Sequence, residues 1–335
     1  METVTLTLDE VLDLAMNVLT RHGCDKRNAD AVARTIWAAE RDEAHSHGLF
    51  RLPGYVASLK SGKANGRADP TVTHLAPGAI RVHGDMGFAP LALAVGRPPL
   101  AEATRQNGVA VLAVTRTHHF AALWPETAAL AEMGLAAMAV TSASTFVAPA
   151  GGTKPLFGTN PMSFAWPRPD GPPVVFDQAS SAMARGEIQL AGRDGHAVPE
   201  GVGINADGNP TTDPAEILKG AQLPFGGYKG SGIALMIELL AGPLINEVCS
   251  FEATEQDNKD GGPATGGEFV LAFDPTLFGA GEGALPHGEA LFERMLAQDG
   301  VRLPGDRRYA ARERTPEIGA QIPQSLHKTI LALLD

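Results

Sequence analysis

Apolar residues recur at helical spacing near the N-terminus of this chain. Residues 8–22 carry an apolar residue at every third or fourth position and stop before Gly23, a pattern that predicts an amphipathic helix. Asp25 has a side chain suited to capping a second helix, which is predicted to run to about residue 44. A short third helix is predicted over residues 49–61.

Beyond residues 64–70, which are predicted as a linker, the pattern changes to short runs of β-forming residues separated by turns. Helices lie between these runs, and Pro98 and Pro99 should break or kink the first of them. The predicted strands are residues 79–83, 109–115, 135–141, 162–166, 174–176 and 268–273, and the predicted helices are 89–106, 121–133, a buried helix at 233–240, 285–298 and 324–334.

Helices at both ends of the chain therefore enclose an α/β middle. We expect the two termini to meet in one helical unit, residues 1–72 with 281–335, and residues 73–280 to form a second, α/β unit.

Composition and charge narrow the class of protein. A chain of 335 residues with 44% hydrophobic content can bury one large core or two smaller ones. Its net charge of -11 argues against nucleic acid or an anionic membrane as the main partner. Cys24 and Cys249 fit no metal-binding spacing and are expected to be free thiols in a reducing compartment.

No targeting or spanning segment is expected. The N-terminus lacks the basic region of a signal peptide, and the most apolar run, residues 233–245, is too short to cross a bilayer. We therefore expect a cytoplasmic protein.

A common dinucleotide-binding motif is absent. No G-x-G-x-x-G stands between a predicted strand and a predicted helix, and no Walker A loop is present. If a nucleotide binds, a fold other than the two common ones must hold it.

The most informative local pattern is Ser46-His47-Gly48 followed by Arg51, where the second helix ends. A histidine beside a hydroxyl can handle a proton, and a guanidinium can bind a carboxylate through two parallel hydrogen bonds. A lone histidine at a helix end is more often a surface or capping residue. Arg51 favours the functional interpretation, because its spacing projects both side chains to one side.

Other histidines could suggest a metal site. Adjacent histidines such as His118 and His119 rarely chelate one ion, and no acidic or cysteine partner has a fitting spacing, so we expect no metal. The pair follows a predicted strand at the start of a predicted helix, where backbone N–H groups can face an anion. A phosphate or substrate contact is as plausible there as a structural role.

Two glycine-containing cationic stretches could bind phosphate. Residues 223–232 place Gly226, Gly227 and Lys229 ahead of an apolar helix, and an ordinary glycine-rich turn is the alternative. Residues 302–308 gather arginines around Pro304-Gly305, and a solvated surface loop is the alternative.

Together these stretches resemble the type-2 malate/L-lactate dehydrogenase family. The matching pieces are Ser46-His47-Gly48 with Arg51 and Tyr55, and residues 155–161, 174–181 and 225–230, which span most of the chain. Residues 118–126 and 302–309 resemble the family's cyclic imine acid reductase branch. The resemblance implies an α/β (α+β), non-Rossmann fold with a mixed, largely antiparallel sheet for the cofactor, a helical domain built from both termini, and a homodimer.

The resemblance also implies roles for individual residues. His47 would be the proton donor, Ser46 its hydrogen-bonded partner, and Glu187 the acidic relay partner, where the family pattern has Asp. Arg51 would bind the substrate carboxylate, with Thr159 and Ser180 nearby. The cofactor-binding residues would be His119, Phe120, Ala121, Ala122, Leu123, Asp177, Gln178, Ala179, Tyr228, Lys229, Arg302, Gly305, Arg307 and Arg308.

The activity that follows from the resemblance is NADPH-dependent reduction of cyclic imine acids, from Δ1-piperideine-2-carboxylate to L-pipecolate and from Δ1-pyrroline-2-carboxylate to L-proline. NADH is the alternative cofactor, although the arginines of residues 302–308 favour NADPH because a 2′-phosphate needs cations. An alternative activity is a 2-hydroxy-acid dehydrogenase of the malate, lactate or ureidoglycolate type. A third is a non-catalytic dinucleotide or amino-acid sensor, which the intact Ser46, His47 and Arg51 argue against.

Overall fold

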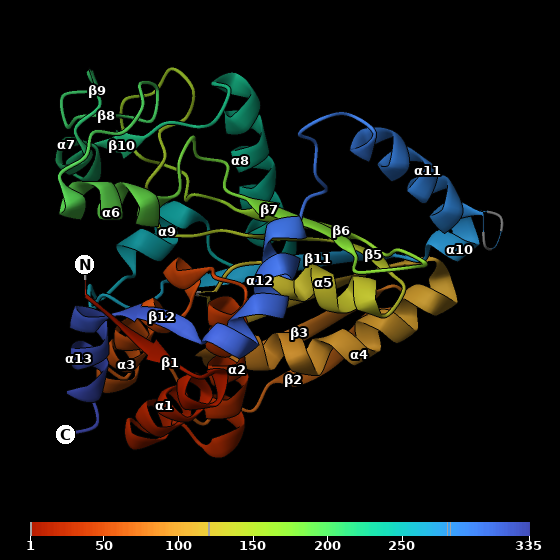
Figure 1. Ribbon diagram of the computed structural model, residues 1–335, viewed down its shortest axis with the longest axis horizontal. Coiled ribbons are helices and arrows are strands. Elements are labelled where there is room, and N and C mark those ends of the chain that lie inside the picture. Colours follow the sequence, from red (N-terminus) through yellow and green to blue (C-terminus); the bar gives the residue numbers. More distant parts are fainter. Residues whose placement is uncertain (1, 120, 280, 282) are drawn as a thin grey trace.

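A seven-stranded sheet runs through the middle of the protein in the computed structural model, which describes residues 2–119, 121–279, 281 and 283–335 (Figure 1). Only β3 and β4 pair in parallel, and the other neighbouring pairs are antiparallel. The expected mixed, largely antiparallel sheet is thus confirmed. In spatial order its strands are β2 (Thr71–Ala76), β3 (Ala79–Phe88), β4 (Val109–His118), β11 (Thr265–Phe273), β5 (Ala136–Thr141), β6 (Met162–Trp166) and β7 (Val174–Gln178).

Helices cover both faces of this sheet. Because successive side chains of a strand point to opposite faces, β11 serves both layers. Val270 and Ala272 pack with α4 (Ala89–Asn107), whereas Phe269 contributes to the cluster beneath α8 (Tyr228–Ala241). The helix α5 (Trp124–Glu132) contacts β5, β6 and β7 on the side of α4.

The helix α4 is continuous. It runs through Pro98 and Pro99, so one of the two outcomes expected there, a break, does not occur. The two prolines deprive the carbonyls of Ala94 and Val95 of their helical donors, and these residues lie on the exposed or partly exposed side, where water can replace the lost bonds. On the opposite side Gly96 lies directly against Leu112, which anchors the helix to the sheet.

The two ends of the chain meet, as expected. Strand β1 (Thr3–Leu6) pairs with β12 (Ala320–Pro323), and one apolar cluster joins residues from both ends. Thr7 caps the first helix in a capping box with Glu10, and Asp25 caps the second by accepting from the Asn28 N–H. The helices of this layer are α1 (Leu8–Arg21), α2 (Lys26–Arg41), α3 (Leu52–Lys60) and α13 (Gln324–Leu331).

The arginine-rich loop turns into a helix that the sequence pattern did not predict. Helix α12 (Asp306–Ile318) begins after Gly305, whose φ of 100° suits glycine, and Asp306 accepts a hydrogen bond from the Leu303 N–H at 2.8 Å. Its sequence has no apolar stripe, so periodicity could not reveal it.

The remaining elements are α6 (Arg185–Asp194), α7 (Pro214–Lys219), α9 (Ser250–Glu255), α10 (Pro275–Phe278), α11 (Ala284–Leu296), the small sheet β8–β10 (Gly203–Ile204, Pro210–Thr211, Ala221–Gln222), and the 3-10 turns η1 (His45–His47), η2 (Leu49–Arg51) and η3 (Pro243–Ile245).

Helix α8 is longer and less buried than expected. Together with η3 it forms an apolar stretch, Tyr228–Ile245, that is long and apolar enough to meet the criteria for a membrane-crossing helix, and 39% of that stretch is buried in the protein. The sequence-based view that residues 233–245 are too short to span a bilayer therefore described only part of the apolar stretch. Leu235 and Leu239 are exposed, whereas Ile237 and Glu238 are buried on the side that packs on the sheet.

Asp42 joins three parts of the fold. Its side chain is fully buried at the end of α2 and accepts two hydrogen bonds from Arg312 of α12, both at 2.8 Å. It also accepts from Trp124 Nε1 of α5 at 3.1 Å and from Arg41 Nε at 2.8 Å. One carboxylate thereby ties the N-terminal helices to the C-terminal segment and to the helix layer of the sheet.

We expect Asp42→Asn to lower the free energy of unfolding by about 3 kcal/mol. The amide has no charge to pair with Arg312, and its NH₂ group would replace a carboxylate oxygen that accepts hydrogen bonds from buried donors. Urea denaturation would measure the change. The matched control is Asp69→Asn, because Asp69 pairs with Arg27 in the open, with 82% of its side chain exposed, and its loss should leave stability unchanged. Equal stability of the two variants would contradict this role of Asp42.

Candidate active site

The turn that carries Ser46 and His47 is shaped by a buried carboxylate. Glu40 is 1% exposed; its Oε1 accepts from the Leu49 N–H and its Oε2 contacts His45 Nδ1, both at 2.7 Å. A side chain at Gly48 would overlap Glu40, so only glycine allows this approach. Glu40 thus fixes both ends of the turn, a role that sequence reasoning missed because its partners lie on irregular backbone.

His47 and Ser46 form the expected pair. Ser46 Oγ lies 3.0 Å from His47 Nδ1, and the imidazole packs edge-on against Trp124, with ring centroids 6.5 Å apart. The pKa of His47 is lowered to about 3; burial is the largest cause, and a positive charge on Arg51 or on His119 contributes in the same direction. The ring is therefore neutral at neutral pH, and a Ser46 hydroxyl donating to Nδ1 leaves the ring proton on Nε2.

Arg51 adjoins the same pair. Its Nε donates to the Ser46 carbonyl at 2.7 Å, which fixes the guanidinium beside the turn. Burial lowers the pKa of Arg51, so its charge acts in a site that water penetrates little. A buried guanidinium next to a histidine and a hydroxyl can hold a carboxylate while a proton moves nearby.

Glu187 is exposed, although the residue before it lies beside this group. The first turn of α6 brings Gly186 against Ser46, since a Cβ at Gly186 would lie 3.8 Å from Ser46 Cβ. Among the hydrogen bonds of the described residues, none joins Glu187 to Ser46 or His47. Its relay role stays a prediction.

Thr159 and Ser180 are brought together. The Ser180 N–H donates to the Thr159 carbonyl at 2.7 Å, and Ser180 Oγ donates to the Asn160 carbonyl at 2.6 Å. The Phe225 N–H in turn donates to the Ser180 carbonyl at 3.0 Å. These bonds place the glycine-rich residues 223–232 next to Thr159 and Ser180, the two residues predicted to lie near the substrate.

A buried polar network holds this segment. Asn160 has a φ of 36°, rare for a residue with a side chain, and its Nδ2 donates to Glu238 Oε1 at 2.8 Å. Glu238 also accepts from the N–H and the hydroxyl of Ser250. In the sequence Glu238 is a single acid within an apolar run, whereas in the structure it fixes the backbone beside Thr159.

Several predicted cofactor residues meet beside Trp124. The Asp177 carboxylate accepts from the Leu123 N–H and pairs with Arg308 at 3.0 Å, and burial raises its pKa against the effect of Arg308. The Arg308 guanidinium lies 4.8 Å from the Trp124 ring centroid. Their chain neighbours are Ala121, Ala122, Gln178 and Ala179; Phe120 falls outside the described residues.

The predicted phosphate-binding stretches are open. Gly227 precedes α8 with a φ of 62° and no side-chain cap, and Tyr228 is 75% exposed. The N–H groups of Gly230 and Ser231 donate to the carbonyls of Phe225 and Gly227 at 3.0 and 3.1 Å. Lys229, Arg302 and Arg307 are exposed, and the described part of the chain contains no ion pair to any of them. The predicted helix after His119 begins only at Trp124, so His119 does not lie at a helix start.

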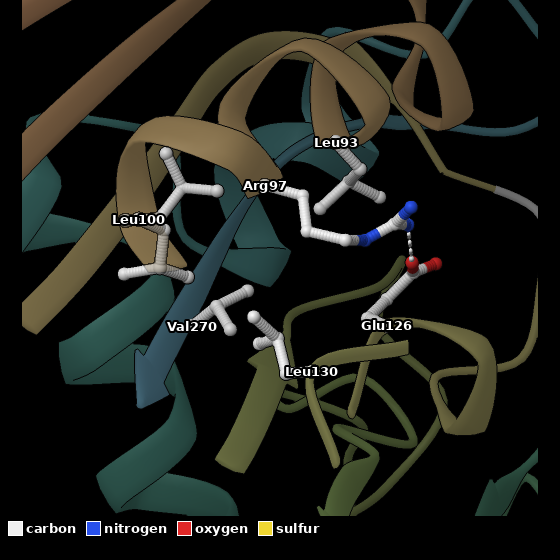
Figure 2. A pocket seen from close by; sticks show the side chains of 7 residues that line it. Leu93, Arg97, Leu100, Glu126, Leu130 and Val270 are labelled. Atoms are coloured by element: carbon white, nitrogen blue, oxygen red, sulfur yellow. Dashed lines mark ion pairs between the residues drawn. The ribbon is translucent and has the colours of Figure 1, made fainter. Parts of the chain in front are cut away.

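Two acidic residues come to His119, contrary to the sequence-based argument that it has no acidic partner. Ligand atoms of His119, Glu126 and Glu268 lie within 4.8 Å of one another, a set that could hold a metal ion. Glu126 comes from α5 and Glu268 from β11, so no sequence spacing could connect them. Arg97 of α4 faces Glu126 at 3.6 Å, across a small, mostly apolar cavity (Figure 2).

Comparison with known proteins supports the family resemblance found in the sequence. The family model for malate/L-lactate dehydrogenase matches residues 6–331. A Δ1-pyrroline-2-carboxylate/Δ1-piperideine-2-carboxylate reductase of Pseudomonas aeruginosa is 49% identical over 334 residues, 99% of this chain and 100% of the relative. A Δ1-pyrroline-2-carboxylate reductase of Pseudomonas fluorescens is 49% identical over 336 residues, 99% of each chain.

A solved structure agrees with these relatives. The Δ1-piperideine-2-carboxylate reductase of Pseudomonas syringae pv. tomato superposes with a TM-score of 0.94 at 41% identity, over 99% of this chain and all of that one. The expected family, its fold and its oxidoreductase class are thereby confirmed. The chain belongs to the malate/L-lactate dehydrogenase family.

Proposed function

We propose that this protein is an NADPH-dependent reductase of cyclic imine acids that converts Δ1-piperideine-2-carboxylate to L-pipecolate and Δ1-pyrroline-2-carboxylate to L-proline. The observation that carries the proposal is the turn on which Ser46, His47 and Arg51 meet within hydrogen-bond distance. The names of relatives that are 49% identical over nearly the whole chain support the same substrate class.

The reaction needs a hydride at C2 and a proton at the ring nitrogen of the imine. Arg51 binds the substrate carboxylate and so presents C2 in one orientation. His47 donates from Nε2 to the imine nitrogen, and Ser46 supports the ring at Nδ1. When the carboxylate neutralises Arg51, one cause of the low His47 pKa weakens, which favours the protonated ring while substrate is bound.

The residues present suit a nicotinamide dinucleotide, which would supply the hydride. The start of α8 offers the positive end of the helix dipole and the exposed cation of Lys229 for phosphate. Residues 302–308 offer exposed arginines, and Pro304 bonds to Val175 of β7 while Phe225 bonds to Ser180. Val175 and Ser180 are five positions apart in the chain, a span of at most about 18 Å. Both cationic stretches can therefore lie along one extended ligand.

Preference for NADPH rests on the two exposed arginines. Arg302 and Arg307 have no carboxylate partner among the described residues, so they can pair with a 2′-phosphate. Glu187, one methylene longer than the family's Asp, acts as the acidic relay partner when its exposed carboxylate turns toward Ser46.

The chain forms a homodimer in this proposal, and α8 supplies the contact. Its exposed side carries Leu235, Met236 and Leu239, and Leu244 and Phe251 continue the apolar surface. Apolar surface of this extent on one side of a soluble protein is typical of an interface. The resemblance to the family implies a homodimer, and we assign this apolar surface to the contact with a second copy of the chain.

Two further proposals concern organisation and compartment. Residues 1–72 with 281–335 form one unit and residues 73–280 the other, with α11 bridging them because Phe292 packs on Val174 and Glu289 pairs with Arg168 at 2.7 Å. The protein acts in the cytoplasm, where its free thiols Cys24 and Cys249 stay reduced.

Oxidation of NADPH, followed by absorbance, tests the substrate class. We expect rapid turnover with both cyclic imines, slow or no turnover with pyruvate and oxaloacetate, and a lower kcat/KM when NADH replaces NADPH. Activity confined to the open-chain keto acids would instead indicate a 2-hydroxy-acid dehydrogenase. Cofactor binding without turnover of any of the four would indicate a sensor.

His47→Asn should separate chemistry from binding. We expect kcat with the cyclic imines to fall by about 10²–10⁴-fold, because the proton donor is lost. NADPH affinity, measured by fluorescence titration, should stay within a few-fold of the original protein. His74→Asn, on the exposed strand β2, is the control and should leave both quantities unchanged. An unchanged kcat in His47→Asn would rule out this role.

Leu239→Lys tests the dimer, since Leu239 is 52% exposed and its replacement should not affect folding. Light scattering should give a dimer mass for the original protein and a monomer mass for the variant. The control is Leu75→Lys, equally exposed on β2, which should stay dimeric. A monomeric original protein would contradict the proposed interface.

A further inference from the structure

A cluster of buried charged groups lies beneath the active-site turn. Glu268 and Glu126 are 1% and 7% exposed, and His119 Nε2 lies 3.2 Å from Glu268 Oε2. Glu268 shares the helix-covered face of β11 with Val270, since side chains two apart point the same way. Figure 2 shows Val270 and Glu126 around the same cavity, with Arg97 reaching Glu126.

The polar atoms of this cluster are poorly satisfied. His119 Nε2 and both carboxylate oxygens of Glu268 are buried and have no hydrogen-bond partner among the described residues. A buried carboxylate without donors is costly, and the usual remedies are a proton, a water or a cation. The adjoining cavity, about 10 Å³, is close to the minimum for one water molecule.

Counting charges decides among these remedies. In the described part of the chain, three groups face Glu268: Glu126 from α5, Arg97 from α4 and His119 from the end of β4. Farther out, Tyr55 from α3 interacts electrostatically with Glu126, and His47 from η1 with His119. Burial lowers the pKa of His119 to about 4, so the histidine is neutral. Two ionised carboxylates would then face a single cation, Arg97, and one added proton makes the cluster neutral.

The proton belongs on Glu268. Glu126 lies next to Arg97, which stabilises its ionised form, whereas Glu268 has no cationic side chain in ion-pair contact within the described residues when His119 is neutral. Burial and the charge of Glu126 raise the pKa of Glu268 well above its ordinary value, and burial also raises the pKa of Glu126. In other proteins, two carboxylates that share a site shielded from water behave in the same way: one stays ionised and the other keeps its proton.

We propose that Glu268 is a protonated carboxylic acid at neutral pH that donates a hydrogen bond to Nε2 of His119, and so acts as a positioning residue for the histidine beside the catalytic His47. The bond leaves the ring proton of His119 on Nδ1 and holds the ring neutral. A neutral His119 adds no positive charge near His47, which would otherwise find protonation still harder. The protonation stands on the cluster alone, whereas its effect on catalysis rests on the proposed function.

Stability measured against pH tests the proton without using activity. Because folded Glu268 keeps its proton above pH 4.5, where the unfolded chain releases it, folding binds a proton and the folded state loses stability as pH rises. Between about pH 7 and pH 8, the raised pKa of His45 and, toward the upper limit, the raised pKa of Cys24 add slopes of the same sign. The contribution of Glu268 is therefore the difference between the original protein and its Glu268→Gln variant. In this range that contribution should raise the unfolding equilibrium constant by up to about tenfold per pH unit.

Glu268→Gln should abolish most of this slope, because the amide is neutral at every pH and still donates to His119. Glu293→Gln, an exposed residue of α11, is the matched control and should keep the original slope. The same slope in Glu268→Gln and in the original protein would overturn the proposal.

Infrared spectroscopy of the original protein provides a second test, should Glu268→Gln fail to fold. A carboxylic-acid carbonyl band should persist at pH 7 and disappear only at higher pH. Absence of that band would overturn the proposal, as would one equivalent of a divalent metal in the purified protein.

Kinetics test the positioning role. Glu268→Gln should keep kcat with the cyclic imines within about threefold at pH 7, whereas Glu268→Leu should lose at least about tenfold in kcat with little change in KM. If Glu268→Leu matches Glu268→Gln at every pH, Glu268 does not position His119. If no imine is reduced by the original protein, the proposed function fails, while the stability and infrared results still decide the protonation.

Discussion

The carboxylate of Asp42 is the contact on which the assembly of this protein depends. It is fully buried, and it gathers donors from α2, α5 and α12, which lie far apart along the chain. A charge in the interior is tolerated only when hydrogen bonds surround it, so the three helices must arrive together for any of them to be stable there. Trp124, one of the donors, also packs against His47. The contact that joins the ends of the chain to its middle therefore also sets one wall of the active site.

The site is built from short segments that buried acids hold in place. Glu40 fixes the turn of Ser46 and His47, Glu238 holds the strained Asn160 next to Thr159, and Asp177 orders the segment around Leu123 through its pair with Arg308. None of these acids needs to touch a substrate to be useful. They satisfy N–H groups of irregular backbone, which cannot find partners in a helix or a sheet. The result is a preorganised site made largely from loops.

The sequence predicted what depends on local pattern and missed what depends on distant partners. Strand β6 was predicted at its observed residues, and the helices near both termini followed from their apolar spacing. Strands β1 and β12 were missed because each is four residues long and is stabilised only by the other. Helix α12 is polar on all sides, so it has no period to detect.

The same limit applies to the site. Ser46, His47 and Arg51 are close in sequence and could be grouped from it, and the resemblance to a family added residues elsewhere in the chain. Glu126 and Glu268 come from different layers of the fold, and neither stands near a recognisable motif. Their meeting at His119 is a property of the sheet register and the helix above it, which single-sequence patterns do not encode.

The pairing of β1 with β12 has a consequence for synthesis in the cell. The Thr3 side chain bonds to that of Gln321, 318 positions away in the chain, so the first strand emerges from the ribosome long before its partner. During that time the apolar side chains of α1 and α2 that later pack on Ala320 and Ile322 have no cover from that end of the chain. Closing so long a loop comes late in folding, and an exposed edge and apolar face attract other chains meanwhile. The N-terminal layer therefore stays incompletely covered until the last part of the chain has been made.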